Sequence, residues 1–428
     1  MTANVDDPFQ RLRNTFIVAN GVSTLGTSMA MLAMSFIIYD QTHSVGATGL
    51  IAVFFYLPSI FLAGVSTRLA SRWGGLKLDC IASTAIVISS LIPVIMSILG
   101  HLTVPVLLVW QLINGICYGV RGPAVSLITR TLAPEGQVQE YNGRLSRAGA
   151  IAGIVGCLAG GQILTHIGAT VLFAFNALST LGVVLVLAPH IKVSTGQPAE
   201  RRIMDVFPLL RNNRPVRGAF ISLLGATLAS CAVVTFPAIA HGFSSRADAL
   251  SYMQAMYAAG GIFVVASIHF ARKRATWGRV EAWCHGLFVV FLTSLGLILL
   301  TPLPPRLIFA IALILVFALG YFFLIANSVL SALMQIGVPE ADRAAGLTAF
   351  TLVSMISIPV GQEFIGILAD LTSTELALIV TAGVVLVMWA TGIATGRPKL
   401  LDQLDDKHQA PELVSKATAQ VPALWNHR

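Results

Sequence analysis

The stretch GIVGCLAGGQIL, residues 153–164, sets four glycines among residues that favour an apolar helix. In water, each such glycine weakens a helix by about 1 kcal/mol relative to alanine. In lipid, helices associate through small residues that let their backbones approach closely. Gly149, Gly153, Gly156 and Gly160 recur at spacings of three or four, which forms one smooth helical face. The stretch therefore indicates a membrane-spanning helix that packs tightly against a neighbour.

The composition of the whole chain indicates the same solvent. Of 428 residues, 56% are hydrophobic and 11% are charged, with a mean hydropathy of +0.80. Soluble domains contain about 25% charged residues. The net charge is +8, but the basic residues lie in short gaps between apolar runs, so no nucleic-acid partner is expected. The five cysteines show no metal spacing and are expected to pack in the interior, and no cofactor or metal is predicted.

Twelve apolar runs are long enough to cross a bilayer, so the fold class predicted is an all-α polytopic membrane protein. The first run is too long for a cleavable signal and is interpreted as a retained span. In the first half the spans are expected at about 14–39, 47–67, 79–99, 104–129, 143–165 and 168–188. In the second half they are expected at about 216–240, 250–270, 283–301, 306–333, 345–369 and 374–396.

These spans divide the chain into two six-helix bundles, 1–188 and 216–396. A central polar linker, 189–215, joins them, and a polar tail, 397–428, is expected to be disordered. With both termini in the cytoplasm, 24 of the 27 Lys and Arg residues fall inside and two fall outside. Such an asymmetry supports this topology by the positive-inside rule, and the expected location is the plasma membrane, the inner membrane of a bacterium.

The two halves resemble each other at a nearly constant offset. Trp73-Gly74 returns as Trp277-Gly278, and GVVLV at 182–186 returns at 383–387. Because each half has an even number of spans, the repeats have the same orientation. This is the plan of a rocking transporter with its substrate site between the halves near the middle of the membrane.

Several motifs resemble the major facilitator superfamily, and within it the enterobactin-exporter-like branch of multidrug and siderophore exporters. These are GVRGPAVSLITRTLAPEG at 119–136, FNALS at 175–179 and the loop TRLASRWGGLK at 67–77. The loop is similar to the gating motif G-x-L-A-D-R-x-G-R, with Arg72 and Gly74 in place and Ser71 where the family has aspartate.

The resemblance implies further roles along the same spans. Gln111, Asn114 and Gly115 resemble the motif R-x-x-Q-G, with glutamine in place of the arginine that the family links to proton coupling. The glycine face is similar to the antiporter motif G-P-x-x-G-G, with Cys157 in place of proline. In the family this face packs against the other half and seals the outward side. The gating residues implied are listed together: Arg72, Gly74, Gly153, Gly156, Gly160 and Gly161.

Ionisable side chains within spans are costly and usually face a cavity or a partner. Three stand out here: Arg121, Glu363 and, at the outer end of span one, Asp40. Counted along the helices at about 1.5 Å per residue, Arg121 and Glu363 lie too far apart to pair, so each is expected to face a water-filled cavity. Glu363 would exchange a proton or bind a cationic solute, and Arg121 would bind an anionic one. His285 is expected at the membrane interface.

Uncharged polar residues in the spans are weaker candidates for the pathway, because each could simply bond a neighbouring helix. They are Gln111, Asn114, Asn327, Gln362, Tyr321 and Tyr257. For Tyr257, packing in the core is the competing interpretation.

The sequence and the resemblance together predict a secondary active transporter that exports a small amphipathic compound, such as a drug, siderophore or natural product, against proton entry. No phosphate-binding Gly-x4-Gly-Lys-Ser/Thr loop is present, and no catalytic constellation indicates an enzyme. The nearest rivals are an importer or an uncoupled facilitator of a small metabolite, and, in another class, a membrane sensor without transport. The expected partners are the solute, protons and the lipid bilayer, with a monomer as the default state.

Overall fold

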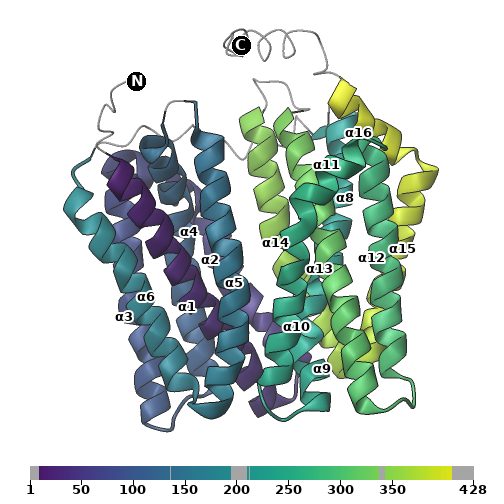
Figure 1. Ribbon diagram of the computed structural model, residues 1–428, viewed down its shortest axis with the longest axis horizontal. Helices are drawn as coiled ribbons and strands as arrows, with labels where there is room; N and C mark the ends of the chain where they lie inside the picture. Colours follow the sequence, from purple (N-terminus) through teal and green to yellow (C-terminus); the bar gives the residue numbers. More distant parts are fainter. Residues whose placement is uncertain (1–8, 135, 194–209, 212, 337–342, 407–428) are drawn as a thin grey trace, which may run out of the picture.

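The computed structural model describes residues 9–134, 136–193, 210–211, 213–336 and 343–406, which are almost entirely helical (Figure 1). The first half contains α1 (Gln10–Thr42), α2 (Val45–Trp73), α3 (Gly75–Ile98), α4 (Val104–Leu132), α5 (Val138–His166), α6 (Ala169–Leu187) and η1 (Ala188–His190). The second half contains α8 (Arg214–Ser230), η3 (Cys231–Thr235), α9 (Phe236–Phe243), α10 (Asp248–Ala259), η4 (Gly260–Phe263), α11 (Val264–Arg272), α12 (Trp277–Leu299), α13 (Pro305–Ile336), α14 (Arg343–Leu371), α15 (Thr374–Ala394) and α16 (Arg397–Asp406).

The helices run up and down between two ends of the molecule. At one end α1, α3, α5, α9, α12 and α14 finish, and we call this the far end. The opposite end, where α1, α3, α8 and α12 begin and α16 lies, we call the terminus end. In Figure 1 the terminus end is at the top and the far end at the bottom.

The predicted repeat is visible in the packing of the helices. In the first half α3 packs against α4 and α6, and in the second half its counterpart α12 packs against α13 and α15. Likewise α1 packs against α5 and α6, as α8 packs against α14 and α15. The halves meet mainly through contacts of α2 with α14 and of α5 with α10. In the repeat α2 corresponds to α10 and α5 to α14, so these two contacts are equivalent. The structure therefore confirms two equivalent bundles.

Eleven helical segments of the described chain are long and apolar enough to cross a membrane. The twelfth expected span, 250–270, is present as three consecutive pieces, α10, η4 and α11. The break falls at Gly260, where an added Cβ would collide with the backbone of Tyr321 and Gly320 on α13. This close approach of two backbones accounts for the small residue and the tightened turn at the break.

The expectation of disorder from residue 397 is wrong for its first ten residues. Arg397–Asp406 forms α16, which packs across the terminus end of the second half with Leu401 and Leu404 fully buried. Oδ1 of Asp402 accepts a hydrogen bond from the backbone N of Gly278 at 2.8 Å. The helix forms because its two leucines cover the apolar ends of α8, α12 and α13. The remainder of the tail lies outside the described residues, as does most of the predicted linker 189–215.

Candidate functional site

The two halves contact each other closely at the far end. Asp370, at the end of α14, accepts hydrogen bonds from Ser44 Oγ at 2.6 Å, from Val45 N at 2.7 Å and from Gly46 N at 3.0 Å. These donors form the N-terminus of α2, where the first backbone N–H groups have no partner within the helix and attract a negative charge. A carboxylate of the second half thus caps a helix of the first half.

Glycines allow the backbones to meet beside this cap. A Cβ on Gly366 of α14 would lie 2.7 Å from Cα of Gly46 on α2. On the other side of the interface, a Cβ on Gly161 of α5 would overlap the side chain of Ser251 on α10. Of the predicted gating glycines, Gly161 is thus in contact with the other half.

The remaining glycines of that stretch do not have the predicted contact. A Cβ on Gly156 would lie 2.7 Å from the carbonyl oxygen of Leu25, and one on Gly160 would lie 3.1 Å from Cα of Met29. Gly153 likewise faces Ser28. All three therefore pack against α1 within their own half, and the expected contact of this face with the other half is wrong for them. Among the glycines of this stretch, Gly161 is the one whose added Cβ would meet α10.

Two further contacts join the halves at the far end. Asp40 of α1 lies 3.5 Å from Nε2 of His241 on α9, with the carboxylate 52% exposed. His166 and Arg246 lie 3.3 Å apart between Nε2 and Nη2. Asp40 is therefore part of the closed end of the molecule and does not line the cavity described below.

Asp370 supplies a specific prediction about this end. We expect Asp370→Asn to lower the ratio of the state with a closed far end to the state with an open one by about 5–30-fold, because about 1–2 kcal/mol of capping energy across the halves is lost. Pulsed EPR distances between labels on the loops at His101 and Leu303 would report the opening. Asp248→Asn, which removes a far-end carboxylate bonded within the second half, is the matched control. Equal distance distributions for Asp370→Asn and the parent protein would contradict the prediction.

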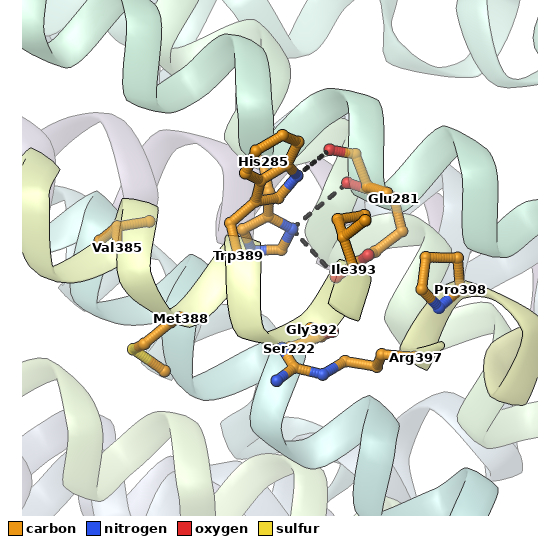
Figure 2. Close-up of a pocket in the computed structure, with 12 residues that line it drawn as sticks. Ser222, Glu281, His285, Val385, Met388, Trp389, Gly392, Ile393, Arg397 and Pro398 are labelled. Carbon is orange, nitrogen blue, oxygen red and sulfur yellow. Dashed lines mark hydrogen bonds and ion pairs between the residues drawn. The ribbon is translucent and has the colours of Figure 1, made fainter. Parts of the chain in front are cut away.

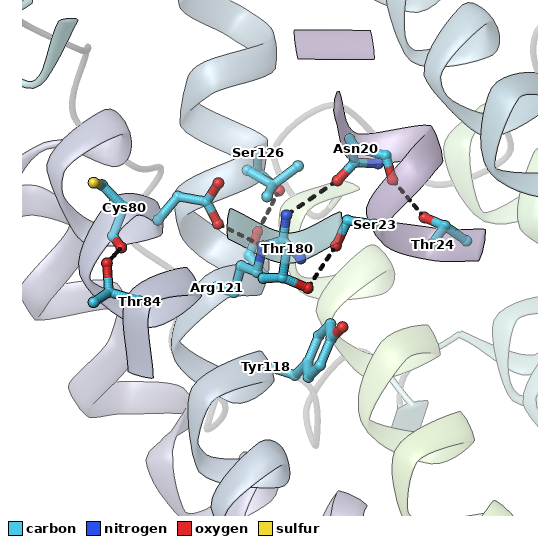
Figure 3. A network of polar contacts seen from close by, with 12 residues as sticks. Asn20, Ser23, Thr24, Cys80, Thr84, Tyr118, Arg121, Ser126 and Thr180 are labelled. Atoms are coloured by element: carbon cyan, nitrogen blue, oxygen red, sulfur yellow. Dashed lines mark hydrogen bonds and ion pairs between the residues drawn. The ribbon is translucent and has the colours of Figure 1, made fainter. Parts of the chain in front are cut away.

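A buried ion pair lies nearer the terminus end, in the first half. Nε of Arg121 on α4 donates to Oδ1 of Asp79 on α3 at 2.6 Å, and the side chains are 7% and 0% exposed. Nη2 of Arg121 also donates to Oδ1 of Asn20 on α1 at 3.2 Å. The guanidinium carbon lies 5.8 Å from the ring centre of Tyr118, which is on the same helix, and Figure 3 shows Arg121 near Asn20 of α1 and Tyr118.

Hydroxyl and amide groups extend this polar region toward mid-depth. They pair between α1, α3, α4 and α6: Ser23 with Thr180, Thr27 with Tyr118 and Asn176, and Asn176 with Ser90. Their separations are between 3.0 and 3.2 Å. Buried hydroxyls and amides need such partners, and this network holds the Arg121 wall in one arrangement.

A cavity of about 530 Å³ lies against this wall, between mid-depth and the terminus end. Its lining residues are Asn20, Ser23, Thr24, Thr27, Ser28, Met31, Tyr118, Arg121, Gly122, Val125, Cys157 and Gln254. Among the described lining residues, Gln254 alone comes from the second half. The cavity therefore lies between the bundles, with a polar wall from α1 and α4.

Arg121 faces a cavity, as the sequence predicts, and it also has a charged partner, Asp79, that the sequence analysis did not name. Sequence reasoning missed Asp79 because span three was predicted to begin at residue 79, at the membrane edge. The helix begins at Gly75, which places Asp79 one turn inside. The sequence offered one signal for this pair: the acidic residue Asp79 precedes the intramembrane Arg121 by 42 positions.

Gln111 and Asn114 lie on the same face of α4, nearer the far end than Arg121. Both are buried, and Gln111 Nε2 lies 3.6 Å from the sulfur of Met31. Oε1 of Gln111 and Oδ1 of Asn114 have no hydrogen-bond partner among the described residues. They continue the polar stripe beyond the cavity without lining it.

Glu363 lies in a different place, on α14 against α2. A groove of about 460 Å³ there is lined by Glu363 and by apolar side chains: Val53, Leu57, Ile60, Ile356, Pro359, Val360 and Phe364. Oε2 of Glu363 is buried beside Gly49 and has no partner among the described residues. Glu363 and Arg121 line separate pockets, as the helix count predicted.

The other predicted pathway residues do not line the central cavity either. Tyr257 packs in the core of the second half, with its ring stacked 6.3 Å from that of Phe323. Tyr321 donates from its hydroxyl to Ser267 Oγ at 2.6 Å and lines an apolar pocket between α11, α12 and α13. Asn327 on α13 and Gln362 on α14 are half-buried.

The loop between α2 and α3 shows local contacts. Gly74, with φ of 79°, ends α2 and begins α3, a left-handed conformation that glycine adopts readily. Arg72 is exposed, and Ser71 Oγ donates to the carbonyl oxygen of Arg68 at 2.8 Å. At the position where the family has aspartate, the hydroxyl thus bonds within its own helix.

A second buried ionisable pair, also missed from the sequence, lies at the terminus end of the second half. His285 Nδ1 and Glu281 Oε1 on α12 are 2.9 Å apart, with side chains 7% and 5% exposed. The pair lines a small pocket of about 20 Å³. Figure 2 shows Trp389 and Arg397 among the side chains around it. His285, predicted to lie near a helix end at the interface, is buried within the bundle, because α12 begins at Trp277 and α16 covers this end.

Three comparisons with known proteins complete these observations. The model of the Major Facilitator Superfamily matches residues 16–362. No curated protein matches the chain. Similar solved structures include a variant of the nucleoside transporter NupG, with a TM-score of 0.73, 17% identity and 90% and 99% of the two chains covered. A D-xylose-proton symporter gives 0.66, 14%, and 88% and 97% coverage. A bacterial homologue of the iron transporter ferroportin, in an inward-facing state, gives 0.63, 14%, and 89% and 98%.

Proposed function

The chain belongs to the Major Facilitator Superfamily, whose members are membrane transporters of small molecules, and we propose that it exports a small amphipathic compound by alternating access. The observation that carries the proposal is the cavity of about 530 Å³ between two equivalent bundles. The far end is closed by Asp370 and Gly161, whereas the cavity lies toward the terminus end. With both termini in the cytoplasm, this arrangement is an inward-facing state, in which an exporter collects its solute.

Alternating access requires the far-end contacts to break while the terminus end closes. The repeat relates the contact of α2 with α14 to the contact of α5 with α10, so the two contacts are equivalent. This equivalence supports such a rocking motion. The polar wall around Arg121 and Tyr118 would bind the hydrogen-bonding groups of the solute. Met31, Val125 and Cys157 would contact its apolar part. The protein would act as a monomer in a bacterial inner membrane.

The direction of transport and its coupling to protons rest on the resemblance to exporters. They are tested with energised inside-out membrane vesicles from cells that express the full chain, and a panel of fluorescent amphipathic dyes. We expect dye uptake into the vesicles that a protonophore abolishes. Dye uptake that the protonophore does not change would indicate a facilitator. Dye movement only out of the vesicles would indicate an importer. If none of the dyes moved across the membrane, a membrane sensor without transport would be favoured.

Glu363 would serve as the proton-exchanging group, since it is a carboxylate in an otherwise apolar groove at the junction of the halves. We expect Glu363→Gln to lower dye export at least about tenfold and to remove its dependence on external pH, because the amide cannot release a proton. The matched control is Glu375→Gln, which removes a carboxylate in the first turn of α15. A wild-type rate and pH profile in Glu363→Gln would assign proton coupling to another group.

A further inference from the structure

The charge of the central cavity indicates which solutes it accepts, an inference that rests on the proposed transport function. Arg121 is the one charged residue among the described side chains that line the cavity. The other polar lining groups are the hydroxyls of Ser23, Thr24, Thr27, Ser28 and Tyr118 and the amides of Asn20 and Gln254. These groups donate and accept hydrogen bonds without attracting either sign of charge.

The carboxylate of Asp79 compensates the positive charge of Arg121. This carboxylate is fully buried and lies 2.6 Å from Nε of Arg121, and Asp79 is not among the residues that line the cavity. Oδ2 of Asp79 has no hydrogen-bond partner among the described residues, so its negative charge is compensated chiefly by Arg121. The pair as a whole is neutral toward the cavity, while Arg121 still offers N–H donors there.

Each charged class of solute meets an unfavourable interaction at this wall. A carboxylate or phosphate on Arg121 would lose its hydration, and repulsion from the buried carboxylate of Asp79 would offset much of its attraction to the guanidinium, so that loss is not recovered. A cation would lose its hydration in the same way and would meet Arg121, which lines the cavity, and not Asp79, so no attraction offsets the loss. A neutral carbonyl, ether or hydroxyl oxygen accepts from the guanidinium without either penalty.

We propose that the cavity binds solutes that are uncharged at the group facing Arg121, and that Asp79 is the residue that excludes organic anions. The solute would present an acceptor oxygen to Arg121 and hydroxyl or amide groups to the row Asn20, Thr24 and Thr27 on α1. An aromatic or aliphatic part would lie against Met31 and Val125. A polyhydroxylated aromatic glycoside has this chemistry and fits the volume.

The electrostatic premise is measurable without a known substrate. Val125→Cys, in an otherwise cysteine-free full-length protein in nanodiscs, would carry a bimane label one turn from Arg121 on the cavity wall. Iodide and acrylamide, an anionic and a neutral quencher, then report the local potential. In the parent protein we expect their quenching ratio to match that of the same label at exposed Ser126.

Two variants are expected to change the ratio of iodide quenching to acrylamide quenching in opposite directions. Asp79→Asn leaves Arg121 uncompensated and is expected to raise iodide quenching relative to acrylamide about threefold. Asn20→Asp places a second carboxylate beside Nη2 and is expected to lower it by a similar factor, which keeps the test available if Asp79→Asn folds poorly. A strongly raised ratio in the parent protein, or no response to either variant, would overturn the proposal.

The substrate class is tested with three matched solutes: p-nitrophenyl glucoside, the anionic glucuronide and the cationic glucosaminide. Their binding is reported by how far each one protects the single thiol of the Val125→Cys protein from labelling. We expect the glucoside to protect best in the parent protein and Asp79→Asn to shift the preference toward the glucuronide about tenfold. A preference of the parent protein for the glucuronide, or protection by none of the three, would refute the proposal. Either result leaves the dye-export test of the transport function standing, and a failure of that test leaves these measurements intact.

Discussion

Replacing Gly161 by valine is expected to lower transport by about 100-fold. A Cβ at this position overlaps the side chain of Ser251 and lies 3.0 Å from the carbonyl oxygen of Ala247, which belongs to the backbone of the other half. A side chain can rotate away, but a backbone carbonyl at the start of α10 cannot, so α5 and α10 must separate. Overpacking of this kind costs about 1–3 kcal/mol, which moves a two-state equilibrium by about 5–150-fold.

The direction of the shift is specific. The steric conflict exists only while the far end is closed, so Gly161→Val should favour the state in which that end is open. The EPR distance between labels at His101 and Leu303 should lengthen, and export should fall about 100-fold because the protein no longer returns to collect solute.

Gly149→Val provides the matched control on the same helix. A Cβ there meets no atom within 4 Å, so the substitution carries the same change in helix propensity without the collision. We expect it to retain transport and the parent distance distribution. Similar losses in both variants would show that valine disturbs α5 itself, and an active Gly161→Val would show that this contact does not close the far end.

Breaking the buried pair on one side only is expected to give the largest loss of stability. Asp79→Ala leaves the guanidinium of Arg121 buried without its carboxylate, and removal of one partner of such a pair costs about 3–5 kcal/mol. The double variant Asp79→Asn/Arg121→Gln removes both charges and should be more stable than Asp79→Ala. Thermal unfolding of the purified parent protein and the two variants in nanodiscs would rank their stabilities.

Asp40→Asn is the control for a carboxylate whose partner is accessible to solvent. Its side chain is 52% exposed and 3.5 Å from His241, and exposed pairs contribute about 0–1 kcal/mol. We expect its unfolding temperature to stay close to that of the parent. If Asp79→Ala unfolded no earlier than Asp40→Asn, the Arg121 charge would have to be stabilised by other groups, such as Asn20.

Several features could be predicted because they depend on local composition. The spans, the repeat and the packing role of small residues follow from runs of apolar residues and their period, which lipid selects directly. Arg121 could be singled out as a candidate pathway residue for the same reason, since a charge within an apolar run requires a special environment.

Other features depended on helix boundaries that hydropathy locates only to within a turn or two. Asp79 and Glu281 lie four residues inside helices that begin at Gly75 and Trp277, whereas the predicted spans began at 79 and 283, so neither acid was identified as lying within a span. The interpretation of the sequence therefore did not pair Arg121 with Asp79 or His285 with Glu281. In the same way, α16 is polar on average, and only the burial of Leu401 and Leu404 makes it a helix of the bundle.

The sequence by itself determined that this chain folds in lipid as two equivalent six-span bundles, because the period and length of its apolar runs are properties of the chain alone. Only the tertiary structure decided that Asp79 neutralises Arg121, that Asp370 caps α2 from the other half, and that Gly161 but not Gly156 meets α10. These contacts depend on the rotation and tilt of each helix about its axis. Those angles are set by the packing of all the helices together.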